Sequence, residues 1–204
     1  MNSCKVAHAA DIHIRGLSRH DEIRTVVEAF CDDVQKQDVD YIVLAGDIFH
    51  TKCNGITSEY FELLTWMCLK MVSACRKKLI VTLGNHDGAL TNISRQDAVS
   101  PVINAMQHPD IILYKESGTF ELEENLYISV FSVFDTDWKK VQPVEGAFNI
   151  AVYHGPVSGA KTETGWDLES NVSVAWFEKY KFDIVLLGDI HKRQFLGYRQ
   201  EISP

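Results

Sequence analysis

Five short runs of apolar, β-prone residues in this chain each end in a polar residue that can hold a metal ion. In an α/β sheet, side chains converge at the carboxyl ends of the strands, because backbone pairing stops there. Polar ligands at five such ends therefore predict one α/β domain with one shared site. The runs and the polar residues that follow them are Val6–Ala10 before Asp11 and His13, Tyr41–Gly46 before Asp47, Leu79–Gly84 before Asn85, His86 and Asp87, Ile150–Tyr153 before His154, and Asp183–Gly188 before Asp189 and His191.

The polar residues at these strand ends offer only carboxylate, amide and imidazole groups. Such a donor set suits a borderline or hard divalent ion rather than a thiolate-bound structural zinc. Asp11 and His13 are two positions apart, so in an extended segment both side chains point to the same side and can reach one ion. The sequence therefore predicts a divalent-metal centre.

Composition describes an ordinary globular chain. Its 204 residues are 46% hydrophobic and 24% charged, which is typical of one soluble domain. No apolar stretch reaches the ~18–20 residues that span a bilayer, and the N-terminus lacks a signal-peptide pattern. Five cysteines without a CxxC pair argue against a disulfide framework or a zinc ribbon. We therefore expect a cytoplasmic protein that is neither secreted nor bound to a membrane.

The net charge of −8 disfavours binding to a polyanion through the general surface field. Three of the negative charges belong to Asp11, Asp47 and Asp189, and two bound divalent ions would bring the balance to about −4. Any nucleic-acid binding is therefore expected to be local to the predicted centre.

The pattern of elements changes along the chain. Apolar residues at helical spacing predict helices from about Asp21 to Gln37 and from about Ser58, and Pro101 is suited to the first turn of a short helix. From Ile111 onward, closely spaced runs predict a second sheet packed on the first. Its expected strands are Ile111–Tyr114, Gly118–Glu121, Leu126–Phe134 and Phe148–Tyr153; a helix from about Asn171 to Lys179 is then expected to lead into a strand at Phe182–Leu187, and a last strand is expected from Phe195. The fold class is therefore α/β, a two-sheet mixed β sandwich flanked by helices.

The strand-end blocks, taken in order, resemble those of the calcineurin-like metallophosphoesterases. Each block alone is weak, but five in the right order, covering nearly the whole chain, are specific. The resemblance implies the fold of that family and two divalent metal ions, most often Mn²⁺, with Mg²⁺, Fe²⁺ or Zn²⁺ as alternatives. The blocks are Asp11-Ile12-His13, Gly46-Asp47-Ile48-Phe49-His50, Gly84-Asn85-His86-Asp87, His154-Gly155 and Gly188-Asp189-Ile190-His191.

Within that superfamily, the chain is most similar to the SbcD-type nucleases that repair DNA double-strand breaks. The opening strand Ala7–His13 and the block Ile190–Arg193 resemble theirs, and His50 stands where Ser/Thr phosphatases have an Asp-Arg-Gly run. The resemblance implies an exonuclease or endonuclease for DNA repair or recombination, located wherever the DNA is, including a nucleoid or nucleus. The implied partners are DNA, an SbcC-type ATPase subunit and a second copy of the chain.

The resemblance also implies a role for each site residue. The first ion would be held by Asp11, His13, Asp47 and His191, and the second by Asp47, Asn85, His154 and Asp189, so that Asp47 bridges the two. The catalytic residues would be His86, which orients the phosphate and protonates the leaving oxygen, and His50, which positions the substrate or nucleophile.

Asp189 departs from the family pattern, because the last block of the family reads Gly-His-x-His. A carboxylate can still coordinate an ion, but it reaches less far than an imidazole and adds a negative charge. We expect the second ion to be retained, Mn²⁺ or Mg²⁺ to be favoured, and phosphate attraction to be weakened.

Two other functions compete with the nuclease. A phosphodiesterase or phosphatase acting on nucleotides or other small phosphoesters keeps the chemistry and suits the acidic composition. A non-catalytic scaffold is disfavoured because His86 and the ligand positions are intact.

Basic residues near the motif loops either contact phosphates or are solvated; they are Arg15, Lys52, Arg95, Lys161, Lys192 and Arg193. By resemblance, residues 1–204 form a phosphoesterase domain truncated at its C-terminus, without the cap and ATPase-docking segments.

Overall fold

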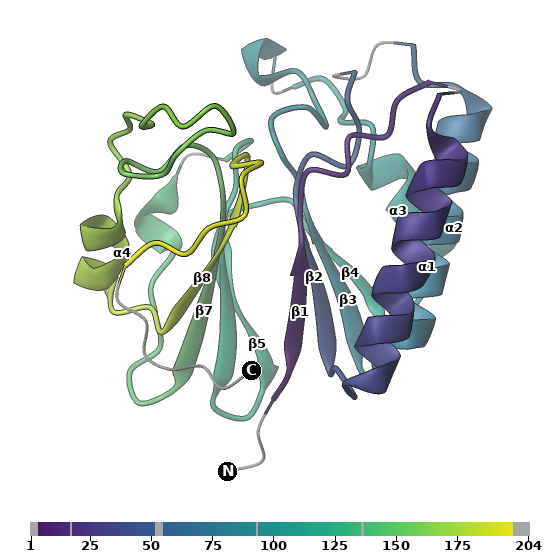
Figure 1. Cartoon of the computed structure of the whole chain (residues 1–204). Helices are drawn as coiled ribbons and strands as arrows, with labels where there is room; N and C mark the ends of the chain where they lie inside the picture. The colour runs from purple at the N-terminus through teal and green to yellow at the C-terminus, as the bar shows by residue number, and fades with distance from the viewer. Residues whose placement is uncertain (1–3, 17, 52–54, 93, 136, 198–204) are drawn as a thin grey trace.

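The computed structural model describes residues 4–16, 18–51, 55–92, 94–135 and 137–197. In this part of the chain two four-stranded sheets face each other, and helices cover their outer sides (Figure 1). The expected α/β class and the two-sheet sandwich flanked by helices are confirmed.

The first sheet is parallel throughout its described strands and has the order β1-β2-β3-β4. Consecutive strands are joined by helices, as parallel pairs require, and these helices lie on one face of the sheet (Figure 1). All five residues of β2 are buried, which explains why its sequence is continuously apolar. The elements are β1 (Val6–Ala9), α1 (His20–Lys36), β2 (Tyr41–Ala45), α2 (Ser58–Ala74), β3 (Lys78–Thr82), the 3₁₀ turn η1 (Leu90–Asn92), α3 (Ser100–Met106) and β4 (Ile111–Tyr114).

The second sheet is mixed and has the order β5-β6-β7-β8. The hairpin β5-β6 is antiparallel, whereas β6, β7 and β8 run parallel. One helix, α4, precedes β8 and packs on the outer side of this sheet (Figure 1). The elements are β5 (Gly118–Glu123), β6 (Leu126–Phe131), the 3₁₀ turn η2 (Trp138–Lys140), β7 (Phe148–His154), α4 (Val174–Tyr180) and β8 (Ile184–Gly188).

The sheet assignment of β4 was wrong. The sequence pattern placed Ile111–Tyr114 in the second sheet, but the strand pairs in parallel with β3, with Leu79 opposite Ile111. The physical reason is α3, which is short but still provides the crossover that a parallel neighbour needs. The second sheet therefore begins one strand later, at Gly118.

Three other expected boundaries also differ. Strand β6 ends at Phe131 instead of Phe134, because the Ser132 hydroxyl accepts a hydrogen bond from the Phe134 backbone and turns the chain. Helix α4 begins at Val174, after Ser173 accepts a hydrogen bond from the Trp176 backbone at 3.3 Å. Of the expected last strand, residues 195–197 are not in a strand, and residues 198–204 lie outside the described residues.

Apolar side chains from both sheets meet in the layer between them. Tyr41, Val43 and Ala45 of the first sheet pack in one cluster with Ile128 and Val152 of the second. This packing brings the carboxyl ends of β1, β2 and β3 close to those of β7 and β8.

Among the described residues, no helix is both long and apolar enough to cross a membrane. Four cysteines are free thiols, and Cys53 lies outside the described residues; the four are Cys4, Cys31, Cys68 and Cys75.

Candidate metal centre

The polar residues at the strand ends of both sheets lie at one edge of the sandwich, the upper edge in Figure 1. The first sheet contributes residues from the ends of three strands, and the second sheet from the ends of two. Those of the first sheet are Asp11, His13, Asp47, His50, Asn85 and His86; those of the second are His154, Asp189 and His191.

The backbone bends sharply where several of these side chains leave the strands. Asp11, His13, Asp47 and Asp189 have φ angles of 59°, 50°, 52° and 73°, in the left-handed region that non-glycine residues rarely adopt. Hydrogen bonds hold this geometry: the Asp11 amide donates to the Gly46 carbonyl at 3.0 Å, and the His13 amide to the Asp47 carbonyl at 2.9 Å. Strained residues at a shared edge are typical of a functional site.

Three glycines make room for the centre. A Cβ on Gly84 would collide with Asp47, and one on Gly188 would collide with the Ala45 carbonyl and the His154 ring. A Cβ on Gly46 would also meet the His154 ring, at 2.5 Å. The sequence reasoning assigned these glycines no role, although each directly precedes a proposed ligand. That repeated pairing is the signal that could have revealed them.

Asp47 lies at the middle of the centre and is only 1% exposed. Its Oδ1 accepts a hydrogen bond from the His86 backbone at 2.8 Å and lies 3.3 Å from His154 Nε2, while its Oδ2 lies 3.6 Å from His13 Nε2. Burial raises the pKa of Asp47, but His154 and the His86 donor outweigh burial and lower the pKa below its usual value. Asp47 is therefore a carboxylate that faces ligands from both sheets.

His154 presents one nitrogen to Asp47. Its Nδ1 donates to the Ala45 carbonyl at 2.7 Å, which leaves Nε2 as the nitrogen that can coordinate an ion. Burial lowers the pKa of His154, but the Asp47 carboxylate outweighs burial and raises the pKa to about 9. A divalent cation therefore competes with a proton for this nitrogen.

Two buried atoms of the centre make no geometrically sound hydrogen bond with the described part of the chain: Asn85 Oδ1 has no partner there, and His154 Nε2 has only its 3.3 Å ion-pair contact with Asp47. A buried polar atom without a partner costs free energy, so each such atom calls for an explanation. Both belong to the predicted ligand set. The residues present therefore fit a divalent cation, which would accept electron density from both atoms.

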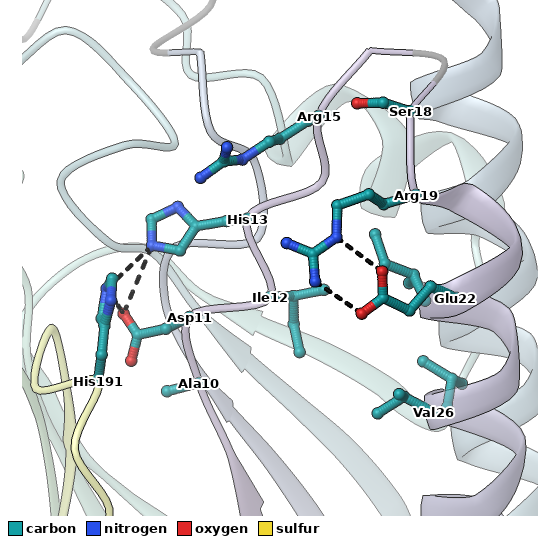
Figure 2. A pocket seen from close by; sticks show the side chains of 12 residues that line it. Ala10, Asp11, Ile12, His13, Arg15, Ser18, Arg19, Glu22, Val26 and His191 are labelled. Carbon is teal, nitrogen blue, oxygen red and sulfur yellow. Dashed lines mark hydrogen bonds and ion pairs between the residues drawn. The ribbon is translucent and has the colours of Figure 1, made fainter. Parts of the chain in front are cut away.

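A second group of ligands lies at the more open side of the centre. His13 Nε2 is 3.3 Å from His191 Nε2 and 4.0 Å from Asp11 Oδ1, and His191 Nε2 is 3.9 Å from Asp11 Oδ1 (Figure 2). Burial lowers the pKa of His13 to about 4, so its ring is neutral at pH 7. Burial also raises the pKa of Asp11, and the nearby His154 opposes this effect. One ligand atom from each of Asp11, His13 and His191 lies within 4.8 Å of the others, and the same holds for Asp11, Asp47 and His154.

His86 and His50 stand beside this group. The His86 Nδ1 donates to the His50 carbonyl at 2.9 Å, so Nε2 is the nitrogen that can give or take a proton. The two rings stack with centroids 5.5 Å apart, and His50 Nδ1 lies 3.4 Å from His13 Nδ1. Both predicted catalytic residues therefore lie next to a predicted ligand.

The structure holds Asp189 mainly by its backbone. The Asp189 amide donates to both oxygens of the Asp11 carboxylate at 3.1 Å. Its own carboxylate belongs to none of the three His and carboxylate groups that the described residues form. Burial raises the pKa of Tyr153, and the charge of Asp189 raises it further. Coordination by Asp189 stays a prediction.

Comparison with known families agrees with this arrangement. The family model for calcineurin-like phosphoesterases matches residues 4–193. The chain belongs to that family. This phosphoesterase is also 35% identical, over 222 residues, to the uncharacterized protein R555 of Acanthamoeba polyphaga mimivirus. The match covers 97% of the phosphoesterase chain but only 15% of the length of the viral relative. A solved structure, the Pseudomonas putida nuclease MPE, is 15% identical with a TM-score of 0.41, and the match covers 79% of this chain and 66% of that chain.

Family membership assigns a chemical class to the centre. Phosphoesterases of this family use divalent metals, and the donors present in this phosphoesterase fit such ions. When bound, divalent ions offset the charge of a phosphate and lower the pKa of water. The chain itself supplies Asp47 between the two ligand groups, and His86 with Nε2 available for proton transfer. The arrangement can therefore hydrolyse a phosphoester.

Proposed function

We propose that this phosphoesterase is a two-metal phosphodiesterase that cuts DNA at ends or in single strands, for repair or recombination. The observation that carries the proposal is the single centre in which Asp47 lies between ligands of both sheets. Three further features support a nuclease: the SbcD-type blocks Ala7–His13 and Ile190–Arg193, and the position of His50 against His13 and His86.

The proposed metal ligands follow the two groups of side chains. The first ion would be held by Asp11, His13, Asp47 and His191, and the second by Asp47, Asn85, His154 and Asp189. Ligand atoms within 4.8 Å of one another support the first group through Asp11, His13 and His191, and a second such set, of Asp11, Asp47 and His154, joins the two groups. Oxygen and imidazole donors suit Mn²⁺, which the resemblance also favours.

His86 is proposed as the proton donor to the leaving oxygen. The His50 carbonyl fixes its Nδ1 as a donor, so a proton on Nε2 makes the ring an imidazolium that can act as a general acid. His50, stacked on the same ring, is proposed to position the substrate.

The deciding experiment measures Mn²⁺-dependent hydrolysis of end-labelled duplex and single-stranded DNA beside bis-p-nitrophenyl phosphate. Removal of a general acid costs about 10²–10⁴-fold in rate, so His86→Ala is expected to lower DNA hydrolysis by that factor. The matched control is His108→Ala, which removes a histidine near the amino end of β4. DNA hydrolysis that needs neither Mn²⁺ nor His86 would reject the proposal.

A second candidate is hydrolysis of nucleotides or other small phosphoesters. The net charge of −8 favours it, because an acidic surface attracts a long polyanion poorly. Turnover of the small diester without turnover of DNA would select this candidate. Failure to turn over either substrate would revive the non-catalytic scaffold.

The partners rest on the resemblance alone. An SbcC-type ATPase subunit and a second copy of the chain are proposed with the nuclease function. Co-purification with such an ATPase, and the mass of the chain in solution, would test them.

A further inference from the structure

A cavity of about 440 Å³ opens beside the candidate metal centre, between the end of β1 and the first turns of α1. Figure 2 shows it with Asp11, His13 and His191 at one end and Arg19 and Glu22 at the other. The side chains between these ends are largely apolar, and the most exposed of them is Val26, at 62%. Ala10, Ile12, Ile23 and Val27 complete that apolar lining. The cavity is thus continuous with the ligands of the centre but is not explained by metal binding.

The two arginines of this cavity differ in their surroundings. Arg19 is held by Glu22 through two hydrogen bonds of 2.7 and 2.6 Å, so its charge is compensated. The Arg15 guanidinium, in contrast, has no hydrogen bond or ion pair with any residue that the structure describes. Arg15 is exposed, and Figure 2 shows it projecting to the same side of the segment as His13.

Arg15 also lies close to the histidines of the centre. Its side chain lines the same cavity as those of His13 and His191. An exposed guanidinium without a carboxylate partner keeps its donors available to an anion. A planar guanidinium can bind a phosphate through two parallel hydrogen bonds.

We propose that this cavity is a subsite for the nucleotide next to the scissile phosphate, and that Arg15 binds the neighbouring phosphate of the same strand. The proposal rests on the nuclease function proposed above. His13 and Arg15 are two residues apart and line the same cavity, so a strand bound at the centre could present its neighbouring phosphate to Arg15. The apolar lining would face the sugar and base, while Arg15 supplies the positive charge that the acidic surface lacks.

The subsite makes Arg15 a residue for substrate selection. A phosphoester with one phosphate needs only the metal centre, whereas an oligonucleotide also presents a phosphate to Arg15. Arg15→Gln should therefore harm oligonucleotide hydrolysis more than bis-p-nitrophenyl phosphate hydrolysis, mainly by raising KM. It should also weaken the salt dependence, because each phosphate contact contributes a slope of about 0.7 in single-stranded nucleic acid.

The test compares wild type, Arg15→Gln and the matched control Arg76→Gln at several salt concentrations. The side chain of Arg76 is 63% exposed and pairs with Asp40 near the amino ends of the strands, far along the chain from the centre. For a single-stranded oligonucleotide, Arg15→Gln should raise KM by about tenfold and reduce the slope of log kcat/KM against log salt by about 0.7. The control should match wild type in both quantities.

Two results would overturn the subsite while the nuclease function stands. One is an equal fall in kcat/KM for the oligonucleotide and the small diester, which would place Arg15 at the scissile phosphate itself. The other is an oligonucleotide KM and a salt slope that do not change. If wild type cleaves the small diester but no oligonucleotide, the nuclease proposal fails first and the subsite fails with it.

Discussion

A glycine stands directly before three of the proposed ligands because no side chain fits at those positions. Gly84 is the clearest case, since an added Cβ would meet both the backbone and the carboxylate of Asp47. The segments that follow β2 and β3 approach closely at this point, and their approach sets the position of Asp47 relative to His154. The geometry of the centre thus depends on residues that donate no ligand.

Gly84→Ala should therefore disturb both stability and metal binding. Overpacking of this kind costs about 1–3 kcal/mol, and the displaced Asp47 carboxylate should bind Mn²⁺ more weakly. Urea denaturation and calorimetric titration with Mn²⁺ measure the two effects. Gly16→Ala is the control, because its new Cβ would meet only the Tyr60 hydroxyl, at 3.8 Å. Wild-type behaviour of Gly84→Ala in both assays would refute the steric argument.

Metal binding by the Asp189 carboxylate can be tested apart from the backbone role of this residue, because its amide donates to Asp11 with any side chain in place. If its carboxylate coordinates the second ion, Asp189→Ala should weaken the affinity for that ion while leaving the first site unchanged. Asp189→Asn tests the charge, since it keeps an oxygen donor but removes the negative charge. Calorimetric titration with Mn²⁺ decides the matter. Equal stoichiometry and affinity in wild type and Asp189→Ala would exclude this residue as a ligand.

At the scale of elements, α3 is anchored by a buried carboxylate. Asp97 Oδ1 accepts hydrogen bonds from the Val99 and Ser100 amides at 3.0 and 2.6 Å, and Oδ2 accepts one from Lys115 Nζ at 2.7 Å. These contacts tie the start of α3 to the segment after β4. The helix in turn connects β3, which precedes Asn85 and His86, to the edge strand.

This anchor predicts a pH dependence of stability. Burial raises the pKa of Asp97, but Lys115 and Ser100 outweigh burial and hold the pKa below its usual value of 3.8. Because the folded pKa is the lower one, the stabilisation is complete above about pH 4 and is lost as the pH falls through the folded pKa.

The test is urea denaturation of wild type and Asp97→Asn between pH 7 and pH 3. Loss of hydrogen bonds to a charged group should cost Asp97→Asn about 2 kcal/mol at pH 7. This difference should shrink below pH 4, as the pH falls toward the lowered pKa of the folded carboxylate. A difference that stays constant over the whole range would show that the charge of Asp97 contributes nothing.

The sequence predicted the strands that carry ligands better than it predicted their partners. Buried parallel strands such as Tyr41–Ala45 have continuous apolar runs, and these are visible without a structure. The sheet to which β4 belongs was wrong, because a four-residue apolar strand fits either sheet and only the crossover by α3 decides. The end of β6 depended on hydrogen bonds of Ser132 that no periodicity reveals.

For the site, the sequence likewise predicted positions along the chain better than contacts between side chains. The strand-end positions predicted which residues would lie together, as the three ligand groups show. The stacking of His50 on His86, and the lack of a partner for the Arg15 guanidinium among the described residues, were beyond prediction. Each depends on side-chain rotamers and on contacts between segments that are distant in the chain.

At the scale of the whole molecule, the proposed ligands divide between the two sheets. Asp11, Asp47 and Asn85 follow strands of the first sheet, whereas His154 and His191 belong to the second. A bound ion would therefore join the sheets across the sandwich, in addition to the apolar layer between them. Unfolding must break this link, so metal binding should stabilise the entire fold.

Thermal unfolding with and without Mn²⁺ measures that link. At a hundredfold excess over Kd, binding contributes about 2.7 kcal/mol, which corresponds to a rise in Tm of about 5–10 °C for a chain of this length. EDTA should reverse the rise. His191→Ala is the informative variant, because a side chain that is 48% exposed contributes little to the metal-free fold but belongs to the second sheet's share of the ligands. Its Tm without metal should match wild type, while the rise with Mn²⁺ should shrink. An undiminished rise would mean that the ion is held without His191 and that the proposed first site is wrong.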